Sequence, residues 1–256
     1  MTALALETRD LHKRFGGLEV VRNLNFNLAP GARHALIGPN GAGKTTFVNL
    51  VAGALSPSHG AILLHGRDIT GLVQAARVKR GIVRTFQISQ LFRNLTVLEN
   101  VALAIAERDG IARVLWRGLA AFPTIVDEAV ALLAGLDLAA DATTAIRALA
   151  YGRQRLVEIA IALALKPSVL LLDEPAAGIP SAESHVILAA LDRLPPAIAV
   201  LIIDHDMGVV FRFARRITVL VGGLTLAEGT PAEIAADPRV RTAYLGESIL
   251  PDGVGR

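Results

Sequence analysis

The chain has 256 residues, 52% of them hydrophobic and 19% charged, which excludes a disordered protein and allows a sizeable buried core. It contains no cysteine, which excludes disulfides and thiolate metal sites and is compatible with a reducing compartment. The formal net charge is +3, but the basic residues are scattered without interleaved aromatic residues, so we expect no nucleic-acid partner.

The distribution of charge and hydropathy also bears on targeting. Charged residues run through segment 1–15, so we expect no signal peptide there. The longest uncharged stretch, Thr45–Gly66, is interrupted by Ser56, Pro57, Ser58 and Gly60, which argues against a transmembrane helix. The apolar excess is therefore expected in buried strands or on a partner surface.

Short apolar runs alternate with longer helical patterns along the chain. The predicted strands are Arg33–Ile37, Ala61–Leu64, Ile82–Phe86, Val169–Leu172, Ala199–Ile203 and Ile217–Val221. The predicted helices are Gly43–Ala52, Val97–Ala106, Thr124–Leu133, Arg153–Leu165, Ser181–Leu194 and Met207–Phe213. This alternation is typical of parallel strands with helical crossovers, so the predicted class is α/β. Segment 88–149 holds helical patterns without a good strand, which indicates a helical insertion.

The stretch "LIGPNGAGKTTF", residues 36–47, interrupts the apolar pattern with glycines. Gly38, Gly43, Lys44 and Thr45 fit the spacing G-x-x-x-x-G-K-[ST], with Gly41 as a further glycine inside the loop. A strand ending at Ile37 would feed this loop into a helix whose N-terminus offers N–H groups to an anion. We therefore expect Lys44 to reach the outer phosphates of a nucleotide and Thr45 to ligate Mg²⁺.

Two later strand ends carry further polar residues. Asp173 follows "VLLL", at the edge where open α/β sheets place ligands, and is predicted to hold the metal partly through water. Glu174 is predicted to polarise a water against the terminal phosphate, although adjacent acids can also cap a turn. His205 follows the apolar run 200–203 and Asp204, and is a candidate γ-phosphate contact, against the alternative of a structural histidine.

Two weaker signals complete the pattern. Gly152 lies at the mouth of the predicted helix Arg153–Leu165, where N–H groups could face an anion, although a plain helix cap is the default interpretation. Gln87 ends "RTFQ" and could touch Mg²⁺ or the attacking water.

Together these residues resemble the nucleotide-binding subunit of an ABC transporter over nearly the whole chain. The loop Gly38–Thr45 looks like Walker A, Val169–Asp173 like Walker B, Gln87 like the Q-loop, and His205 like the switch histidine. The resemblance implies catalytic roles for Glu174, His205, Lys44 and Gln87, and metal ligation by Thr45, Gln87 and Asp173. It implies nucleotide binding by Phe15, Gly38, Pro39, Asn40, Gly41, Ala42, Gly43, Lys44, Thr45, Thr46, Ala150, Tyr151, Gly152, Arg153 and Gln154.

The resemblance also implies the architecture. We expect one ABC ATPase domain over 1–256, with a P-loop NTPase core, an antiparallel β portion at the N-terminus and an inserted α-helical subdomain. The core is expected at 1–87 and 161–256, and the helical subdomain with the signature motif at 88–160.

Several segments narrow the subfamily. "FGGLEVV", "RTFQISQLFRNLTVLENV", "AYGRQRLVEIA" and "LAEGTPAEIAADPRVRTAYLG" are similar to ATPase subunits of importers for branched-chain and other hydrophobic amino acids. Two positions depart from the family pattern. Ala150 replaces the signature serine, which removes a hydroxyl contact to the γ-phosphate. Pro180 replaces the usual Asp or Asn, which puts communication between paired sites through that loop in doubt.

The implied reaction is hydrolysis of ATP with Mg²⁺. The implied partners are a second ATPase subunit, identical or different, two integral-membrane permeases and, indirectly, a periplasmic solute-binding protein. The implied location is peripheral, on the cytoplasmic face of the cell membrane. The alternatives are an importer ATPase for urea, amides or another small solute, a soluble ABC ATPase outside transport, and a non-hydrolysing nucleotide-binding regulator.

Overall fold

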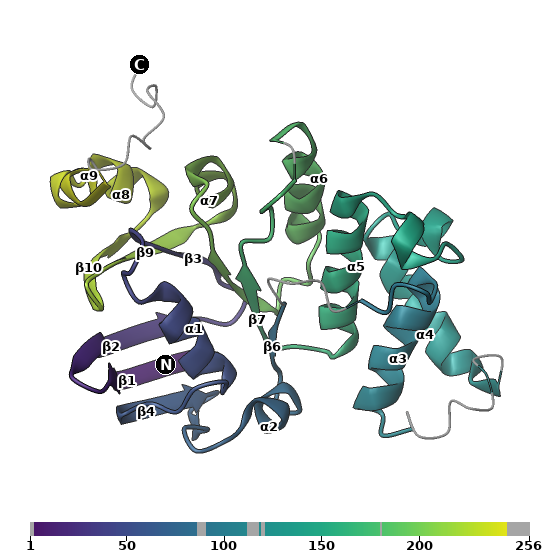
Figure 1. Cartoon of the computed structure of the whole chain (residues 1–256), viewed down its shortest axis with the longest axis horizontal. Coiled ribbons are helices and arrows are strands. Elements are labelled where there is room, and N and C mark those ends of the chain that lie inside the picture. Colours follow the sequence, from purple (N-terminus) through teal and green to yellow (C-terminus); the bar gives the residue numbers. More distant parts are fainter. Residues whose placement is uncertain (1–2, 86–90, 112–117, 119–120, 180, 245–256) are drawn as a thin grey trace.

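The computed structural model describes residues 3–85, 91–111, 118, 121–179 and 181–244. These residues form two β-sheets and a set of helices, and the helices within residues 97–164 are gathered at one end of the molecule (Figure 1). Among these residues, none of the helices is both long and apolar enough to cross a membrane.

The larger sheet has six strands in the order β10-β9-β3-β8-β7-β6. Its strands are β3 (Arg33–Ile37), β6 (Ile82–Arg84), β7 (Val169–Asp173), β8 (Ala199–Ile203), β9 (Arg216–Val221) and β10 (Leu224–Gly229). The pairs from β9 to β6 are parallel, and β10 is antiparallel to β9. Every residue of β7 and β8 is buried, as expected for strands covered on both faces. Because the strands from β9 to β6 run parallel, their carboxyl ends share one edge of the sheet.

The smaller sheet is antiparallel, in the order β2-β1-β4-β5, and it confirms the predicted N-terminal β portion. It contains β1 (Leu6–Phe15), β2 (Leu18–Leu28), β4 (His59–Leu64) and β5 (Arg67–Asp68). Helix α1 (Lys44–Ala52) lies between this sheet and the larger one, and Phe47 of α1 meets Phe26 of β2 with ring centroids 5.3 Å apart (Figure 1). This shared apolar core fixes the start of α1 against both sheets.

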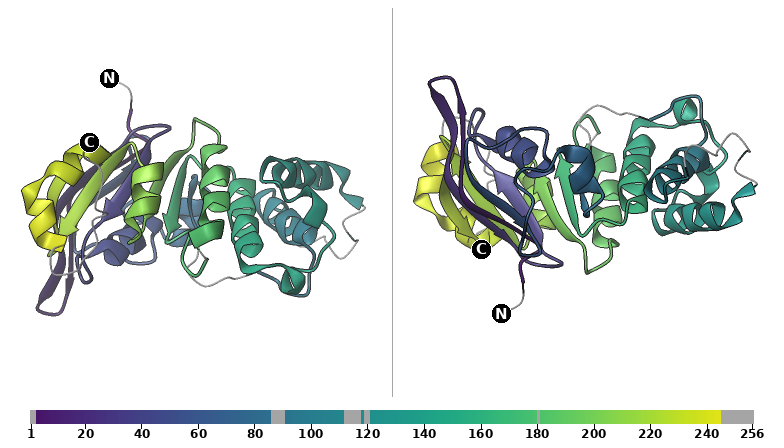
Figure 2. Two further views of the ribbon diagram at one scale, coloured as in Figure 1. Left: turned by 90° about the horizontal axis from the view of Figure 1, so that it is seen from above. Right: turned by 90° about the horizontal axis from the view of Figure 1, so that it is seen from below.

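Helices α3 (Val97–Arg108), α4 (Pro123–Gly135) and α5 (Tyr151–Ala164) form a block beside the larger sheet, visible in both views of Figure 2. Arg108 ties the block together because its Nη1 donates to the Glu128 carboxylate at 2.6 Å and to the Ala164 carbonyl at 2.7 Å. The predicted helical insertion is therefore present between β6 and β7.

The remaining helices border the sheets and connect strands. They are α2 (Gln74–Val78), α6 (Ser181–Asp192), α7 (Met207–Phe213), α8 (Pro231–Ala236) and α9 (Pro238–Tyr244), with short 3₁₀ turns at Ala139–Asp141 and Ile146–Ala148.

The predicted strands and helices are all present. Arg33–Ile37, Ala199–Ile203 and Met207–Phe213 have the predicted bounds, and the ends of the others are shifted. The strand predicted to run to Phe86 ends at Arg84, and the helix predicted to begin at Arg153 begins at Tyr151. The ranges of β1 and β2 were not predicted, because irregular pairing and the positive φ angles of Asp10 and Asn23 break the alternation of buried and exposed residues. The sequence analysis also did not predict β10, the hairpin partner of β9, or the short elements β5, α2, α8 and α9.

Candidate functional site

The glycine loop connects β3 directly to α1. Gly38, Gly41 and Gly43 have φ angles of 154°, 77° and 101°, which residues other than glycine rarely adopt. Gly43 is the N-cap of α1, and within the described part of the chain no side chain caps that helix end. The first N–H groups of α1 are therefore available to an anion.

Lys44 folds back over the loop that precedes it. Its Nζ donates to the Gly38 carbonyl at 2.5 Å and to the Pro39 carbonyl at 3.1 Å. The ammonium group of Lys44 thus contacts the backbone carbonyls of the glycine loop, next to the N-terminus of α1. This arrangement places a cation close to the N-terminus of α1, as phosphate binding requires.

Two neighbouring segments hold the loop in place. The Ala42 carbonyl accepts a hydrogen bond from Gly223 N at 3.0 Å, between β9 and β10. A Cβ added at Gly43 would lie 2.7 Å from the Val20 carbonyl oxygen, so the loop touches the start of β2. Phe15 ends β1 just before that strand and is 45% exposed, with Lys13 Nζ 5.0 Å from its ring centroid. An exposed ring at the end of the strand that precedes β2 is suited to stacking on a base.

Asp173 and Glu174 follow β7 at the shared carboxyl edge. Asp173 is buried, and its Oδ2 accepts a hydrogen bond from Arg84 Nη2 at 2.6 Å. Glu174 has a φ of 46°, and its N–H donates to the Ile203 carbonyl of β8 at 2.7 Å. A positive φ is uncommon at a residue other than glycine, and here it occurs directly after the last residue of β7.

His205 meets Glu174 across the ends of β7 and β8. Its Nδ1 lies 3.3 Å from Glu174 Oε1, and its side chain is largely exposed. The preceding Asp204 is buried, and burial raises the pKa of its carboxyl group. Asp204 Oδ1 accepts from Asp206 N at 2.9 Å, and Asp206 in turn caps α7. These turns hold the histidine loop in place beside the glutamate.

The signature segment lies apart, at the start of α5. Ala150 is the N-cap of α5, so Gly152 lies within its first turn rather than before it, which corrects the predicted start. Ala150 and Tyr151 are exposed, whereas Arg153 is bonded to the Asp141 carboxylate and Gln154 Nε2 donates to the Leu149 carbonyl at 2.9 Å. The exposed residues at the N-terminus of α5 are accessible to another molecule.

Two predicted positions have no structural account. Gln87 and Pro180 lie outside the described residues. Conversely, Arg84, Asn49 and Asp204 were not predicted as site residues. A charged residue at the end of the apolar run "GIV" was the available signal for Arg84.

The donor set suits Mg²⁺. Thr45 is exposed at the second position of α1, which follows β3, and Asp173 supplies a carboxylate at the end of β7, on the same edge of the sheet with β8 between the two strands. In the ranges that the structure covers, no group of three or more His, Asp or Glu side chains is arranged to hold a metal ion. Mg²⁺ needs no such cage, because it usually takes one or two protein oxygens together with phosphate oxygens and waters.

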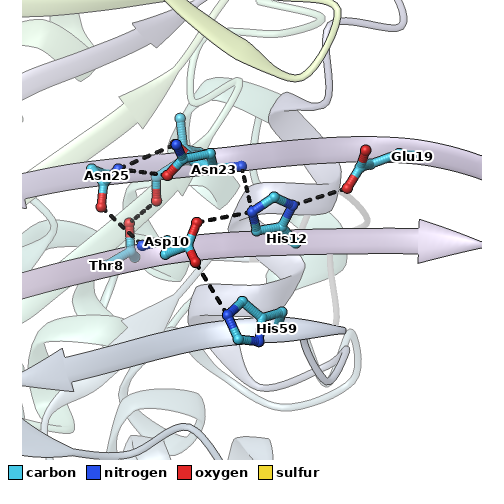
Figure 3. Close-up of polar contacts among 8 residues, drawn as sticks. Thr8, Asp10, His12, Glu19, Asn23, Asn25 and His59 are labelled. Carbon is cyan, nitrogen blue, oxygen red and sulfur yellow. Dashed lines mark hydrogen bonds and ion pairs between the residues drawn. The ribbon is translucent and has the colours of Figure 1, made fainter.

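A second polar cluster lies on the smaller sheet (Figure 3). His12 of β1 contacts Glu19 Oε1 through Nδ1 and Asp10 Oδ1 through Nε2, each at 2.9 Å. Hydrogen bonds to Glu19 and Asp10 raise the pKa of His12. His59 Nε2 of β4 lies 3.1 Å from Asp10 Oδ2. These side chains join three strands of the sheet and are not part of the glycine-loop site.

Comparisons with known proteins bear on the family of the chain. A family model described as "ABC transporter" matches residues 21–177, and one described as "Branched-chain amino acid ATP-binding cassette transporter" matches residues 225–249. The high-affinity branched-chain amino acid transport ATP-binding protein LivG of Escherichia coli (strain K12) is 40% identical over 97% of this chain and 100% of its own length.

Solved structures support the same relationship. The crystal structure of the ADP conformation of an ATP-binding cassette of an ABC transporter has a TM-score of 0.82 and 30% identity, covering 95% of this chain and 99% of that chain. A dimeric post-hydrolysis cassette bound to ADP and Pi has a TM-score of 0.73 and 25% identity, covering 88% of this chain and 98% of that chain. The chain therefore belongs to the ABC transporter family, as an ATP-binding cassette.

Proposed function

We propose that the chain is the ATP-hydrolysing subunit of an importer for branched-chain or related amino acids. The observation that carries the proposal is the meeting of the Lys44 loop, the Asp173–Glu174 pair and His205 at one edge of a parallel sheet. The substrate class is supported by what the Escherichia coli relative is named for and by the family match at residues 225–249.

The phosphates of ATP would lie on the glycine loop, at the mouth of α1. Lys44 would leave the Gly38 and Pro39 carbonyls and turn to the outer phosphates, where its charge offsets theirs. Phe15 would stack on the adenine. Thr45 and Asp173 would hold Mg²⁺, with Gln87 as a further contact, and the ion would neutralise charge on the outer phosphates.

Glu174 would orient the attacking water and accept its proton. The water oxygen bonds to the γ-phosphorus while the bond from that phosphorus to the bridging oxygen breaks, which releases ADP and phosphate. His205, 3.3 Å from Glu174, would help stabilise the charge on the transferred phosphoryl group. A positioned general base of this kind contributes about 10²–10⁴-fold to the rate.

A second copy or a related subunit would complete each site. Its Ala150, Tyr151, Gly152, Arg153 and Gln154 would present the exposed mouth of α5 to the γ-phosphate. The likeness to a dimeric cassette that holds ADP and Pi supports this arrangement. The divided architecture proposed with it has a nucleotide-binding core at 1–87 and 161–256 and a helical subdomain at 88–160.

Membrane partners would dock beside β6 and the helical block. A cavity of about 290 Å³ opens there, lined by Thr85, Leu91, Phe92, Asn100, Glu158 and Ile161, among others. Phe92 is 61% exposed at this cavity, which suits an apolar segment of a permease. Two permeases would seat a pair of these subunits on the cytoplasmic face of the cell membrane, and a periplasmic solute-binding protein would deliver the amino acid to them.

Uptake in the native host tests the proposed substrate. A strain lacking this chain should lose uptake of labelled leucine, isoleucine and valine, and the wild-type gene should restore it. The Glu174→Gln gene should fail to restore uptake even though its chain is expressed and folded like the wild type. This variant is the matched control, because it shows that uptake requires the carboxylate. Normal uptake of these amino acids in the deletion strain, together with lost uptake of urea or an amide, would contradict the substrate assignment.

Dimerisation tests the completed site. Glu174→Gln should form a dimer with ATP, whereas the double variant with Gly152→Asp should bind ATP and remain a monomer, because a carboxylate would face the partner's phosphate. Light scattering beside a nucleotide titration separates the two outcomes. A normal ATP-driven dimer in the double variant would exclude Gly152 from the shared site.

A further inference from the structure

Arg84 lies where three parts of the candidate site meet. It is the last residue of β6, and its Nη2 donates to Asp173 Oδ2 at 2.6 Å. Its Nη1 donates to Asn49 Oδ1 at 2.5 Å, on the helix that begins with Lys44. One guanidinium therefore joins the end of β6, the end of β7 and the phosphate-binding helix.

Burial makes the contact between Arg84 and Asp173 matter. The Asp173 side chain is 3% exposed and the Arg84 side chain 14%. A buried carboxylate needs a cation or hydrogen-bond donors, and among the described residues Arg84 is the ion-pair partner of Asp173. The planar guanidinium bonds two acceptors in fixed directions, which a lysine ammonium does not do. The orientation of the Asp173 carboxylate thus depends on Arg84.

We propose that Arg84 is a positioning residue for the metal-site carboxylate. Arg84 holds Oδ2 of Asp173 through Nη2 while its Nη1 is fixed by Asn49, and in this proposal Oδ1 of Asp173 is the oxygen left for the metal. The inference rests on the proposed function, because it takes Asp173 as a partner of Mg²⁺. The positive charge of Arg84 opposes a nearby cation, but the ion pair with Asp173 already compensates that charge. We expect the loss of orientation to outweigh the removal of this repulsion when the arginine is replaced.

The same residue also lines the proposed docking cavity. Arg84 contributes to the wall of the cavity of about 290 Å³ together with Val83, Thr85 and Phe92. A permease segment seated there would contact the side chain that holds Asp173. The position of Arg84 thus connects the partner surface to the metal carboxylate through a single residue.

Binding of Mn²⁺ to the complex of the full chain with ADP tests the inference. It is measured as the loss of the electron paramagnetic resonance signal of free Mn²⁺. Arg84→Met keeps most of the apolar stem and removes the fork, and it should weaken Mn²⁺ binding by about 10–100-fold, the usual loss when a partner of a metal ligand is removed. ADP binding in the presence of a chelator should be unchanged. Arg84→Lys keeps the charge without the fork and should restore only part of the affinity.

Arg33→Met is the matched control. Arg33 is also partly buried, but it donates to the Ile198 and Leu194 carbonyls at the opposite end of the sheet, so its loss should leave Mn²⁺ affinity unchanged. A folded Arg84→Met chain that binds Mn²⁺ as tightly as the wild type, or more tightly, would overturn the inference.

Two further variants decide the question if Arg84→Met does not fold. Arg84→Lys and Asn49→Ala each remove part of the same bonding, and both should weaken Mn²⁺ binding. Unchanged affinity in both would overturn the inference. A wild-type chain that binds no ADP would instead contradict the proposed function, and the inference with it.

Discussion

Replacing Gly43 with alanine should damage the glycine loop more than the same change at Gly41. Both residues have positive φ angles, 101° at Gly43 and 77° at Gly41. A Cβ at Gly43 would lie 2.7 Å from the Val20 carbonyl oxygen, whereas one at Gly41 meets no described atom within 4 Å. The pair of variants therefore separates backbone strain from contact with β2.

The expected costs follow from these two terms. A left-handed backbone costs an L-residue about 1–2 kcal/mol, so Gly41→Ala should lower the free energy of unfolding by about that amount. Gly43→Ala carries a similar backbone strain. It also forces α1 and β2 apart, which should lower the free energy of unfolding further, by about 1–3 kcal/mol, as at other overpacked sites. Its total should reach about 2–5 kcal/mol.

Urea unfolding with linear extrapolation measures both costs, and titration with ADP measures the effect on the site. Gly43→Ala should also weaken ADP binding, because the mouth of α1 moves. Equal losses of unfolding free energy in the two variants would refute the claim that the loop is seated against Val20.

Three further predictions concern catalysis and pH. Glu174→Gln should keep ATP binding and lower steady-state turnover by about 10²–10⁴-fold, and turnover within a few-fold of wild type would exclude Glu174 as the base. Burial lowers the pKa of His34 from 6.5 to about 4, so the unfolded state binds the extra proton between these values and stability falls as pH drops from about 6.5 toward 4. The full loss is about 3 kcal/mol, and His34→Gln should flatten unfolding free energy against pH over that range. His12 has the opposite sign: its raised pKa contributes stability below about pH 6.5 that is lost as pH rises through the folded value, and His12→Gln should remove this dependence in the same measurement.

The arrangement of the candidate site could largely be predicted because its signals are local. The glycine loop, the acid pair after "VLLL" and the histidine after β8 each lie within a few residues of a buried strand. Since the carboxyl ends of parallel strands share one edge, the order of the strands then brings Glu174 and His205 together, as their 3.3 Å contact confirms.

The contacts that hold the site could not be predicted in the same way. Arg84 and Asp173 are 89 residues apart in the chain, and nothing near either residue identifies the other. The seat of Gly43 against Val20 likewise depends on how the smaller sheet packs on α1. Such pairs follow from tertiary packing, whereas sequence patterns report mainly on the local backbone and on burial.

The range of β1 shows a related limit. Its pairing with β2 shifts register between Thr8 and Leu11, between Leu11 and Lys13 and again between Lys13 and Arg14. Each shift moves the following side chains relative to the two faces of the sheet, so no simple alternation remains in the sequence. The cluster around His12 lies in this irregular stretch and was missed with it (Figure 3).

Release of phosphate from ATP by the purified chain is the most direct test of the central claim, that this glycine loop and strand edge hydrolyse ATP. With Mg²⁺ present, the wild-type chain should release phosphate steadily, and Lys44→Ala should stop the release because the cation above the loop is gone. A wild-type chain that binds ATP and releases no phosphate would contradict the account, as would a Lys44→Ala chain that turns over as fast as the wild type.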